Sequence, residues 1–479
     1  MAAAGIFNQR EIAESLRLSR NTVSRTLKKA KEKSKLGIEP VYDVRELGVP
    51  RTLVLGVQHL FAMFGATILV PILTGLNVST ALLTAGVGTL FFHLVTGGKV
   101  PAFLGSSFAF IAGYLHVGQN DPAKLPYACG GVFVAGFVYV IVAGIIRLVG
   151  PKRVMRFFPP VVTGPVIMLI GLILAPVAIG GPGDGGIMDT LVRVKDGAAL
   201  PGGVNWVIAL GAIAAIIVSN LWGRGMLKIV PILAGVIVGY VLSLLFGIVD
   251  FSALKGVGIV GVPVTASQIM KFDVSAIITI VPIALATMME HVGDIVAISA
   301  TVGKNFIAKP GLHRTLIGDG VATSLASIVG GPANTTYGEN TGVLVLTRVY
   351  DPRVMQVAAV MAIIASFVPV VGGAIGSIPS VVIGGVSFIL YGMITAIGVR
   401  NMVENQVDLT NTRNLIIAAV ILVSGLGFDV RGGLTFPVGA TEINLSGLAI
   451  AAILGIVLNA VLPGKDYEFS DEAGEAEDK

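Results

Sequence analysis

The chain has 479 residues, of which 54% are hydrophobic and 13% are charged, and its net charge is +5. Soluble globular proteins carry charge on about a quarter of their residues, so this composition excludes an ordinary soluble domain and indicates a polytopic membrane protein. The single cysteine, Cys129, excludes an intramolecular disulfide framework and a cysteine-rich metal site.

The first predicted element is a basic extension, residues 1–41, which we expect to be cytoplasmic and to contain no cleavable signal peptide. Apolar residues at helical spacing within residues 9–31 resemble the two-helix unit of helix-turn-helix DNA-binding domains. The residues that would lie where such a unit contacts DNA are Arg20, Asn21, Thr22 and Arg25. A complete domain needs a further helix to bury its apolar face, so the pattern favours a basic tail over DNA binding or a membrane-tethered regulator.

The next elements are membrane spans, each of which needs about 20 mostly apolar residues. Twelve runs meet or approach this length: 53–73, 80–95, 127–148, 161–179, 204–221, 229–248, 274–302, 315–329, 354–371, 381–397, 415–428 and 445–462. Two shorter and broken segments, 100–112 and 332–347, complete a predicted set of fourteen. An even number of spans places both chain ends on the same side of the membrane.

The loop charges predict that this side is the cytoplasm. Lys and Arg are enriched in cytoplasmic loops, and the loops on the side of the N-terminus contain most of them. Fewer lie on the opposite side, namely Lys124, Arg193, Lys195, Lys255, Lys271 and Arg431. Residues 464–479 form an acidic segment that we expect to be a disordered cytoplasmic tail.

The two broken segments predict a substrate site. Residues 331–342 combine Pro332, three glycines and small polar side chains, which would interrupt a helix. Irregular backbone at membrane depth must be buried in protein or line a wet cavity. An ionisable group there indicates function, and Glu339 is such a group. It follows Gly338 at the expected start of a half-helix, where free N–H groups favour negative charge or hydrogen-bond acceptors.

The break at residues 100–108 resembles the break at 331–339, and this similarity predicts an internal repeat. Pro101-Ala102 corresponds to Pro332-Ala333, and Gln58-His59 corresponds to Glu290-His291 at nearly the same offset. An odd number of predicted spans separates the members of each pair, so the second copy would be inverted. Inverted repeats with interrupted helices are a common layout of secondary transporters, whose sites lie where the breaks meet. A chance match of short peptides is the alternative.

Further polar groups at membrane depth extend this site. Glu290 and Asp294 are four residues apart on one helix face, where two ionised carboxylates would repel, so we expect one to hold a proton and to serve as a proton carrier. Structural acids paired with backbone donors or a Lys or Arg are the alternative. Phe108 could stack on a flat ligand or simply pack. Asp319 is a weaker member of the group, and His59 and His93 are expected to pack between helices rather than bind metal.

Three runs resemble bacterial uracil permeases of the nucleobase–ascorbate transporter (nucleobase:cation symporter-2) family. They are residues 58–67 (QHLFAMFGAT), 105–110 (GSSFAF) and 334–340 (NTTYGEN). Residues 339–348 also fit the signature of that family, which is an acid or amide, Asn, any residue, Gly, four residues, Thr and a basic residue. The resemblance extends over about residues 42–463.

The resemblance implies an all-α membrane protein with fourteen segments in two inverted seven-span repeats, residues 42–250 and 251–463. It further implies core and gate domains, short antiparallel strands in the broken third and tenth segments, and often a homodimer. Glu290 and Glu339 would hold the edges of a nucleobase, and the backbones of Phe108 and Gly338 would complete its hydrogen bonds.

The resemblance also has implications for the residues on either side of Gly338 and Glu339 and for the coupled ion. Tyr337 and Asn340 belong to the same matched motif and are expected at the substrate. Asp294 stands where uracil permeases have a histidine that links protonation to binding, so the coupled ion is a proton or, alternatively, sodium. The acid at position 339 resembles the uracil branch rather than the xanthine branch.

The sequence therefore predicts proton-coupled import of uracil by alternating access in the bacterial inner membrane. A xanthine or purine permease is the nearest alternative, and an anion transporter of the same fold is a more distant one. We expect no enzyme activity, since no nucleophile–base pair or metal cluster stands out, and no cofactor.

Overall fold

The computed structural model describes residues 40–119, 121–180, 185–189, 202–254, 258–438 and 441–464. The helix-turn-helix-like residues 9–31 and the acidic residues 465–479 lie outside the described residues. The predicted boundary between repeats, near residue 250, falls in the connection between the helix that ends at Leu245 and the helix that begins at Val274, just before the 3-10 turn Ser252–Leu254.

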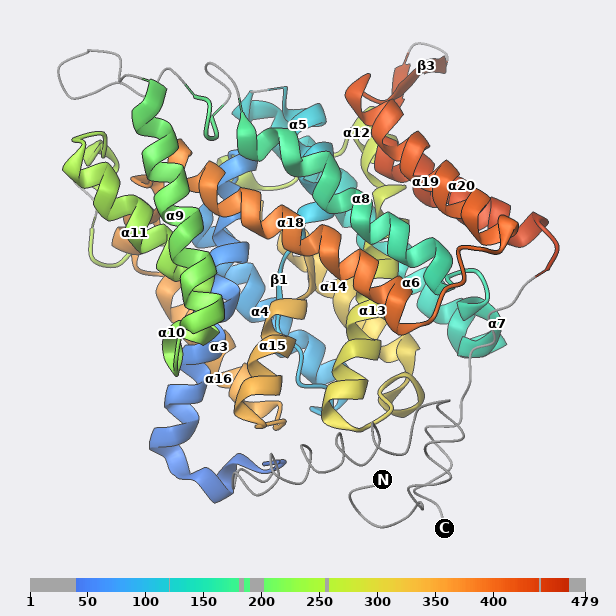
Figure 1. Ribbon diagram of the computed structural model, residues 1–479, viewed down its shortest axis with the longest axis horizontal. Helices are drawn as coiled ribbons and strands as arrows, with labels where there is room; N and C mark the ends of the chain where they lie inside the picture. The colour runs from blue at the N-terminus through green and yellow to red at the C-terminus, as the bar shows by residue number, and fades with distance from the viewer. Residues whose placement is uncertain are drawn as a thin grey trace.

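The described residues are mostly helical (Figure 1). The helices before residue 250 are α3 (Gly48–Thr74), α4 (Val78–Thr96), α5 (Ile111–Gly118), α6 (Leu125–Val149), α7 (Pro151–Met155), α8 (Pro160–Ile179), α9 (Gly202–Trp222), α10 (Met226–Ile229) and α11 (Pro231–Leu245). Those after it are α12 (Val274–Ile280), α13 (Ile283–Val302), α14 (Leu312–Ile328), α15 (Gly338–Thr347), α16 (Arg353–Ser366), α17 (Pro369–Gly376), α18 (Ser380–Glu404), α19 (Thr412–Val430) and α20 (Gly447–Val461).

Eight helices of the described chain are long and apolar enough to cross a membrane, or nine if the bent pair α16–α17 forms one span. Shorter apolar helices, Phe108–Gly118, Pro231–Leu245 and Gly447–Val461, accompany them. The chain is therefore a multi-pass membrane protein.

The predicted single span 354–371 is wrong as a straight helix. α16 and α17 meet at an angle of 83°, and Pro369 occupies the first turn of α17. A residue before proline is pushed out of the helical conformation, and Val368 accordingly has φ −107° and ψ 89°. The bend follows from this proline, whose effect the apolar run concealed.

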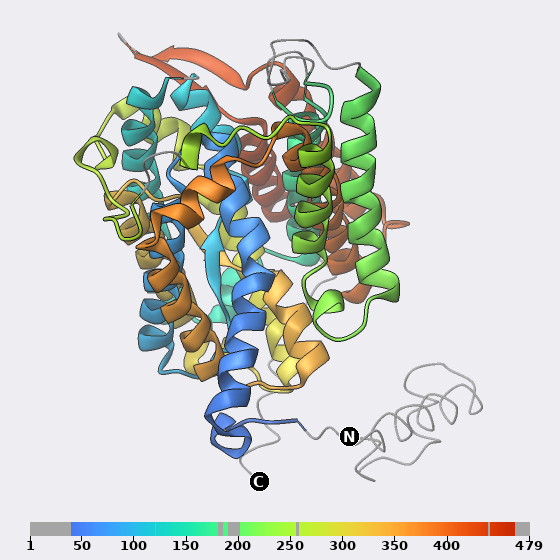
Figure 2. The same cartoon turned by 90° about the vertical axis from the view of Figure 1, so that its left-hand side faces the viewer.

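Two short strands lie where the sequence predicted broken segments. β1 (Leu104–Ser106) and β2 (Asn334–Thr336) pair antiparallel, with Gly105 opposite Thr335. Backbone bonds extend the pairing at both ends, since Ser107 N donates to Ala333 O (2.8 Å) and Tyr337 N donates to Phe103 O (3.0 Å). All six strand residues are buried, and Figure 2 shows β1 behind α3 in the middle of the molecule.

Side chains from neighbouring helices satisfy the outer edges of this small sheet. Thr89 of α4 accepts a hydrogen bond from Leu104 N at 2.9 Å, and Thr323 of α14 donates to Asn334 O at 2.7 Å. A buried backbone group without a partner would be costly in a medium that contains no water. The strands are therefore fixed between α4 and α14 as well as to each other.

A second hairpin, which the sequence analysis did not predict, connects α19 to α20. β3 (Leu434–Val438) pairs antiparallel with β4 (Thr441–Leu445). It lies at the opposite end of the molecule from the start of α3 (Figures 1 and 2).

Glycines allow the long helices to pack closely. α18 packs along α8, and a Cβ on Gly398 of α18 would lie 2.5 Å from Met168 N and 2.6 Å from Gly164 O of α8. Small residues at such contacts let helix backbones approach each other in a membrane, where no hydrophobic force drives helices together. The α8–α18 contact therefore depends on the missing side chain.

We predict that Gly398→Ala lowers the apparent Tm of the detergent-solubilised protein by several degrees, because relieving such overpacking costs about 1–3 kcal/mol. The matched control is Gly392→Ala in the same helix, where an added Cβ meets nothing within 4 Å. Size-exclusion chromatography after a temperature series measures both variants. Equal Tm values for the two would contradict the packing argument.

Candidate functional site

The predicted acidic residues come together around α13. Glu290 and Asp294 lie on α13, Glu339 is the second residue of α15, and Asp319 lies on α14. The charges of Glu339 and Asp319 act on both Glu290 and Asp294. α13 contacts α15, β2 and η3 (Phe108–Phe110), the turn that follows β1. The carboxylates thus gather beside the place where the two breaks meet.

These carboxylates have no cationic partner from Lys or Arg within the described chain. Among the described residues, Arg353 pairs with Asp43 and Asp351, and Arg400 pairs with Glu404. Glu290, Asp294 and Glu339 are half-buried, so they are neither sealed in the core nor free in solvent. The Oε2 atom of Glu290 is buried and has no hydrogen-bond partner in the part of the chain that the structure describes. Such a group needs a proton, a ligand or another donor.

One further titratable side chain near these acids, His291, was not predicted as a site residue. His291 Nδ1 is 3.2 Å from Asp319 Oδ2, and both side chains are fully buried. The same Nδ1 atom is 3.3 Å from Thr336 Oγ1, and that hydroxyl donates to Asp294 Oδ2 at 3.3 Å. The available signal was His291 itself, which stands directly after Glu290 in the sequence.

Tyr337 and Asn340, both predicted at the substrate, have side chains that contact other parts of the protein. The Tyr337 hydroxyl donates to Ser106 O at 2.9 Å and accepts from Thr67 Oγ1 at 3.2 Å. The amide of Asn340 lies 3.3 Å from His59 Nδ1 of α3, and its Oδ1 atom is buried without a partner. A role in binding would therefore fall to the backbone of Tyr337 and to Oδ1 of Asn340.

Gly338 leaves space beside the acids. It is half-buried, and a Cβ built on it would lie 3.2 Å from Asp294 Oδ1. Because Gly338 has no side chain, Asp294 Oδ1 can lie close to its backbone. This is the position that the resemblance assigned to a backbone contact with the ligand.

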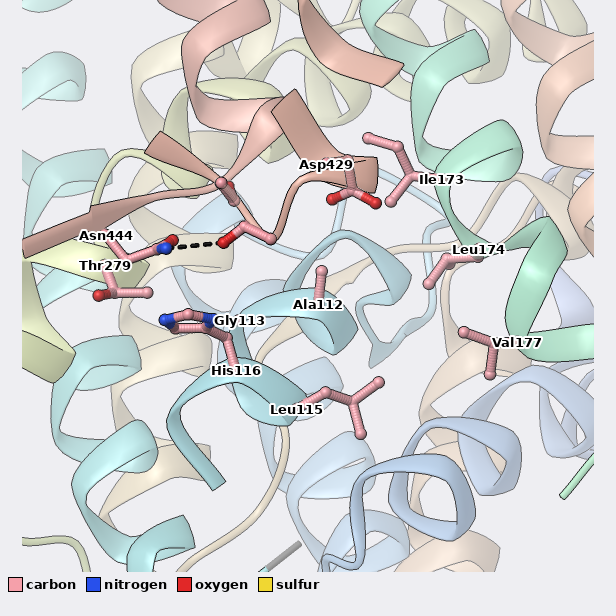
Figure 3. Close-up of a pocket in the computed structure, with 13 residues that line it drawn as sticks. Ala112, Gly113, Leu115, His116, Ile173, Leu174, Val177, Thr279, Asp429 and Asn444 are labelled. Carbon is pink, nitrogen blue, oxygen red and sulfur yellow. Dashed lines mark hydrogen bonds between the residues drawn. The ribbon is translucent and has the colours of Figure 1, made fainter. Parts of the chain in front are cut away.

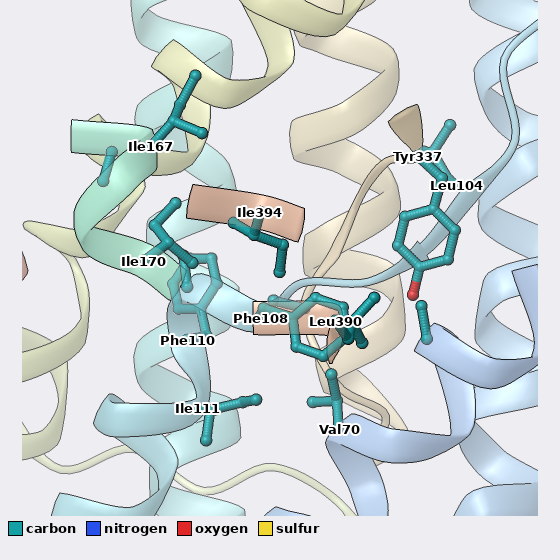
Figure 4. Packing of buried hydrophobic residues seen from close by; sticks show 14 of the residues in the cluster. Val70, Leu104, Phe108, Phe110, Ile111, Ile167, Ile170, Tyr337, Leu390 and Ile394 are labelled. Atoms are coloured by element: carbon teal, nitrogen blue, oxygen red, sulfur yellow. The ribbon is translucent and has the colours of Figure 1, made fainter. Parts of the chain in front are cut away.

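Phe108 is part of the apolar packing in this conformation. Only 4% of its surface is exposed, and its ring meets that of Tyr391 edge to face at 6.1 Å. Figure 4 shows the ring beside Leu390 and Val70. A ligand that stacks on the ring must therefore displace these contacts.

The two histidines that the sequence assigned to packing are buried between helices. His93 Nε2 lies 2.9 Å from Ala102 O, just before β1, and His59 meets Asn340 as described above. In the part of the chain that the structure describes, no three His, Cys, Asp or Glu side chains form a group that could hold a metal ion.

A cavity in the described part of the chain lies away from Glu290, Asp294 and Glu339. It has a volume of about 270 Å³, and its walls include the polar residues His116, Thr279, Asp429 and Asn444 (Figure 3). Ala112, which also lines it, is four residues from Phe108 along η3 and α5. The other walls come from α8, including Ile173, and from the β3–β4 end of α19 and α20.

Comparisons with known proteins place this geometry in context. A family model described as "Permease family" matches residues 50–430. The chain is 43% identical to the uracil permease of Bacillus caldolyticus over 89% of this chain and 96% of the relative. It is 42% identical to the uracil permease of Bacillus subtilis with the same coverage. It is 36% identical to a putative pyrimidine permease of Escherichia coli over 87% of this chain and 90% of the relative.

Solved structures show a related fold at low sequence identity. The transmembrane domain of the cyanobacterial bicarbonate transporter BicA matches with a TM-score of 0.58 and 15% identity, over 88% of this chain and all of that chain. The structure of SLC26A9 matches with a TM-score of 0.60 and 12% identity, over 88% of this chain and 66% of that chain. At these identities the similarity is one of transporter fold alone.

We predict that Tyr337→Phe lowers the stability of the protein by about 1–3 kcal/mol, because Ser106 O and Thr67 Oγ1 would lose a buried partner. Thermal unfolding in detergent measures the change. Tyr127→Phe is the control, since Tyr127 is a half-buried residue of α6 whose hydroxyl forms no hydrogen bond among the described residues. If both variants unfold at the wild-type temperature, the phenol does not hold β1 in place.

Proposed function

This chain belongs to the permease family that includes the uracil permeases, and we propose that it imports uracil by proton symport. The acidic group at the meeting point of the two breaks carries the proposal. Glu290 and Glu339 would accept hydrogen bonds from the two N–H groups of uracil, since ionised carboxylates are acceptors only. In the alternative function, the same site would bind xanthine or another purine instead of uracil.

The unpartnered polar atoms support a ligand at this position. Within the described residues, Glu290 Oε2 and Asn340 Oδ1 are buried acceptors without donors, and leaving such atoms unsatisfied costs about 1–3 kcal/mol each. A planar solute with several N–H groups supplies the missing donors without adding charge. The backbones of Gly338 and of Phe108, which begins η3 just after β1, would provide further hydrogen bonds.

The anion-transporter alternative shares the fold but suits this site poorly. An anion in contact with Glu290, Asp294 and Glu339 would meet three carboxylates, with no Lys or Arg paired to them in the described residues. Like charges at short range repel strongly where water is scarce. A neutral solute avoids this repulsion, so the acidic site favours a base over bicarbonate or sulfate.

For the architecture, we propose fourteen segments in two inverted seven-span repeats, residues 42–250 and 251–463. The antiparallel pairing of β1 with β2 and the helix breaks around them support it. Transporters of this kind rock one domain against another around a central site. The cavity lined by α5, α8 and the β3–β4 end would be an approach to that site from outside, past Phe108 and Phe110.

Localisation, assembly and coupling complete the proposal. We place the protein in the bacterial plasma membrane with both termini in the cytoplasm, and we infer a homodimer. Asp294 and Glu290 would carry the coupled proton, since one proton reduces the repulsion within the acidic group. Sodium is the alternative coupled ion.

We predict that Glu290→Gln and Glu339→Gln each reduce uracil uptake by about 10- to 100-fold or more, because each replaces a charged acceptor with a neutral amide. Uptake of radiolabelled uracil into cells with matched membrane expression measures this. Glu404→Gln is the control, since Glu404 is exposed at the end of α18 and pairs with Arg400. Wild-type uptake by both site variants would rule out the carboxylate site.

We predict that an uncoupler of the proton gradient abolishes uracil accumulation, because import against a gradient would lose its driving force. A sodium gradient imposed without a proton gradient should not restore it. Unlabelled uracil should compete at far lower concentrations than xanthine, bicarbonate or sulfate. Stronger competition by xanthine would identify a purine permease, and accumulation driven by sodium would identify the other ion.

A further inference from the structure

The buried pair of His291 and Asp319 lies beside the proposed uracil site but does not belong to its binding groups. His291 is on α13, one residue after Glu290, and Asp319 faces it from α14. Neither side chain has any exposed surface. Substrate binding alone does not explain why a titratable pair is fully buried here.

A hydroxyl connects this pair to the acidic group. Thr336 Oγ1 of β2 lies 3.3 Å from both His291 Nδ1 and Asp294 Oδ2. His291 Nδ1 lies 3.2 Å from Asp319 Oδ2. The four groups therefore form a continuous path from a half-buried carboxylate, through a threonine, to an imidazole and a second carboxylate.

The groups around His291 leave it as the only nitrogen base on this path. Carboxylates face the region from α13 (Glu290 and Asp294), α14 (Asp319) and α15 (Glu339), and their charges interact. From α6, the Tyr139 hydroxyl donates to Thr287 Oγ1, and from α4 the Phe92 ring meets the imidazole at 6.4 Å. Within the described chain, no Lys or Arg forms an ion pair with these groups.

We propose that the His291–Asp319 pair accepts the coupled proton from Asp294 through the hydroxyl of Thr336. This inference rests on the proposed proton symport. The hydrogen on Asp294 Oδ2 moves to Thr336 Oγ1 while the hydroxyl hydrogen of Thr336 moves to His291 Nδ1. Asp294 becomes a carboxylate, Thr336 is unchanged, and His291 becomes an imidazolium next to the carboxylate of Asp319. The reverse transfer returns the proton.

This arrangement explains how the site gives up its proton. A cation formed alone in an apolar core would be strongly destabilised, but an imidazolium at hydrogen-bond distance from a carboxylate is compensated. The transfer leaves Asp294 charged beside Glu290 and Glu339, and the resulting repulsion changes how the site holds uracil. Thr336 and His291 are thus positioning and relay residues, and they do not contact the substrate.

The test compares two assays on the full-length protein in proteoliposomes. Exchange of internal unlabelled uracil for external labelled uracil needs no net proton release, whereas accumulation driven by a proton gradient does. The variants are Thr336→Val, which replaces the hydroxyl by a methyl group, and His291→Asn, which retains a hydrogen-bonding atom near Nδ1. Thr336→Ser restores a hydroxyl. Thr74→Val is the matched control, because among the described residues the Thr74 hydroxyl donates only to Val70 O of its own helix.

We expect Thr336→Val and His291→Asn to lose accumulation by about tenfold or more while exchange stays within about threefold of wild type, a loss of the size produced by removing a proton-transfer group. Thr336→Ser and Thr74→Val should accumulate uracil normally. Normal accumulation by Thr336→Val, or parallel loss of exchange and accumulation in both variants, would overturn the relay. A wild-type protein that fails to accumulate uracil would instead refute the proposed function.

Discussion

The pairing of β1 with β2 is the constraint on which the rest of the structure depends. Both strands run through an apolar interior where water cannot satisfy their backbone groups. Each break therefore needs the other as its hydrogen-bond partner, with Gly105 opposite Thr335. Thr89 and Thr323 satisfy groups at the outer edges. Neither half of the chain could keep an interrupted helix in a bilayer without the other half.

This pairing also determines where the acids lie. β2 ends at Thr336, Tyr337 bonds back to the strand region of the first half, and α15 begins at Gly338. Glu339 consequently enters the first turn of a half-helix, where free backbone N–H groups favour negative charge. α13 packs against both β2 and α15, so Glu290 and Asp294 lie beside the same point. The interruption at β2 thus brings residues of β2, α13 and α15 together.

The sequence could predict the breaks but not all of their contacts. Pro101 and Pro332, with the glycines near them, interrupt helices through local backbone effects. The positions of the breaks could therefore be predicted from the sequence, as could the strongly apolar spans. The side-chain contacts of Tyr337 and Asn340, and the meeting of His291 with Asp319, depend on how α13, α14 and β2 pack in space. Pro369 marks the bend that precedes it, but the apolar residues on both sides made the segment resemble one continuous span.

The comparison with anion transporters shows why fold and function must be argued separately. BicA and SLC26A9 share the fold at 12–15% identity, and a fold supports many functions through different sites. In the described part of this chain, the interrupted helices present carboxylates without a paired Lys or Arg. Such a site repels anions, and it is stabilised by protons, which reduce its charge, or by N–H donors, which satisfy its acceptors. In the proposed transport cycle, the N–H groups of the solute and the coupled proton stabilise the same acids, so their binding is coupled through those acids.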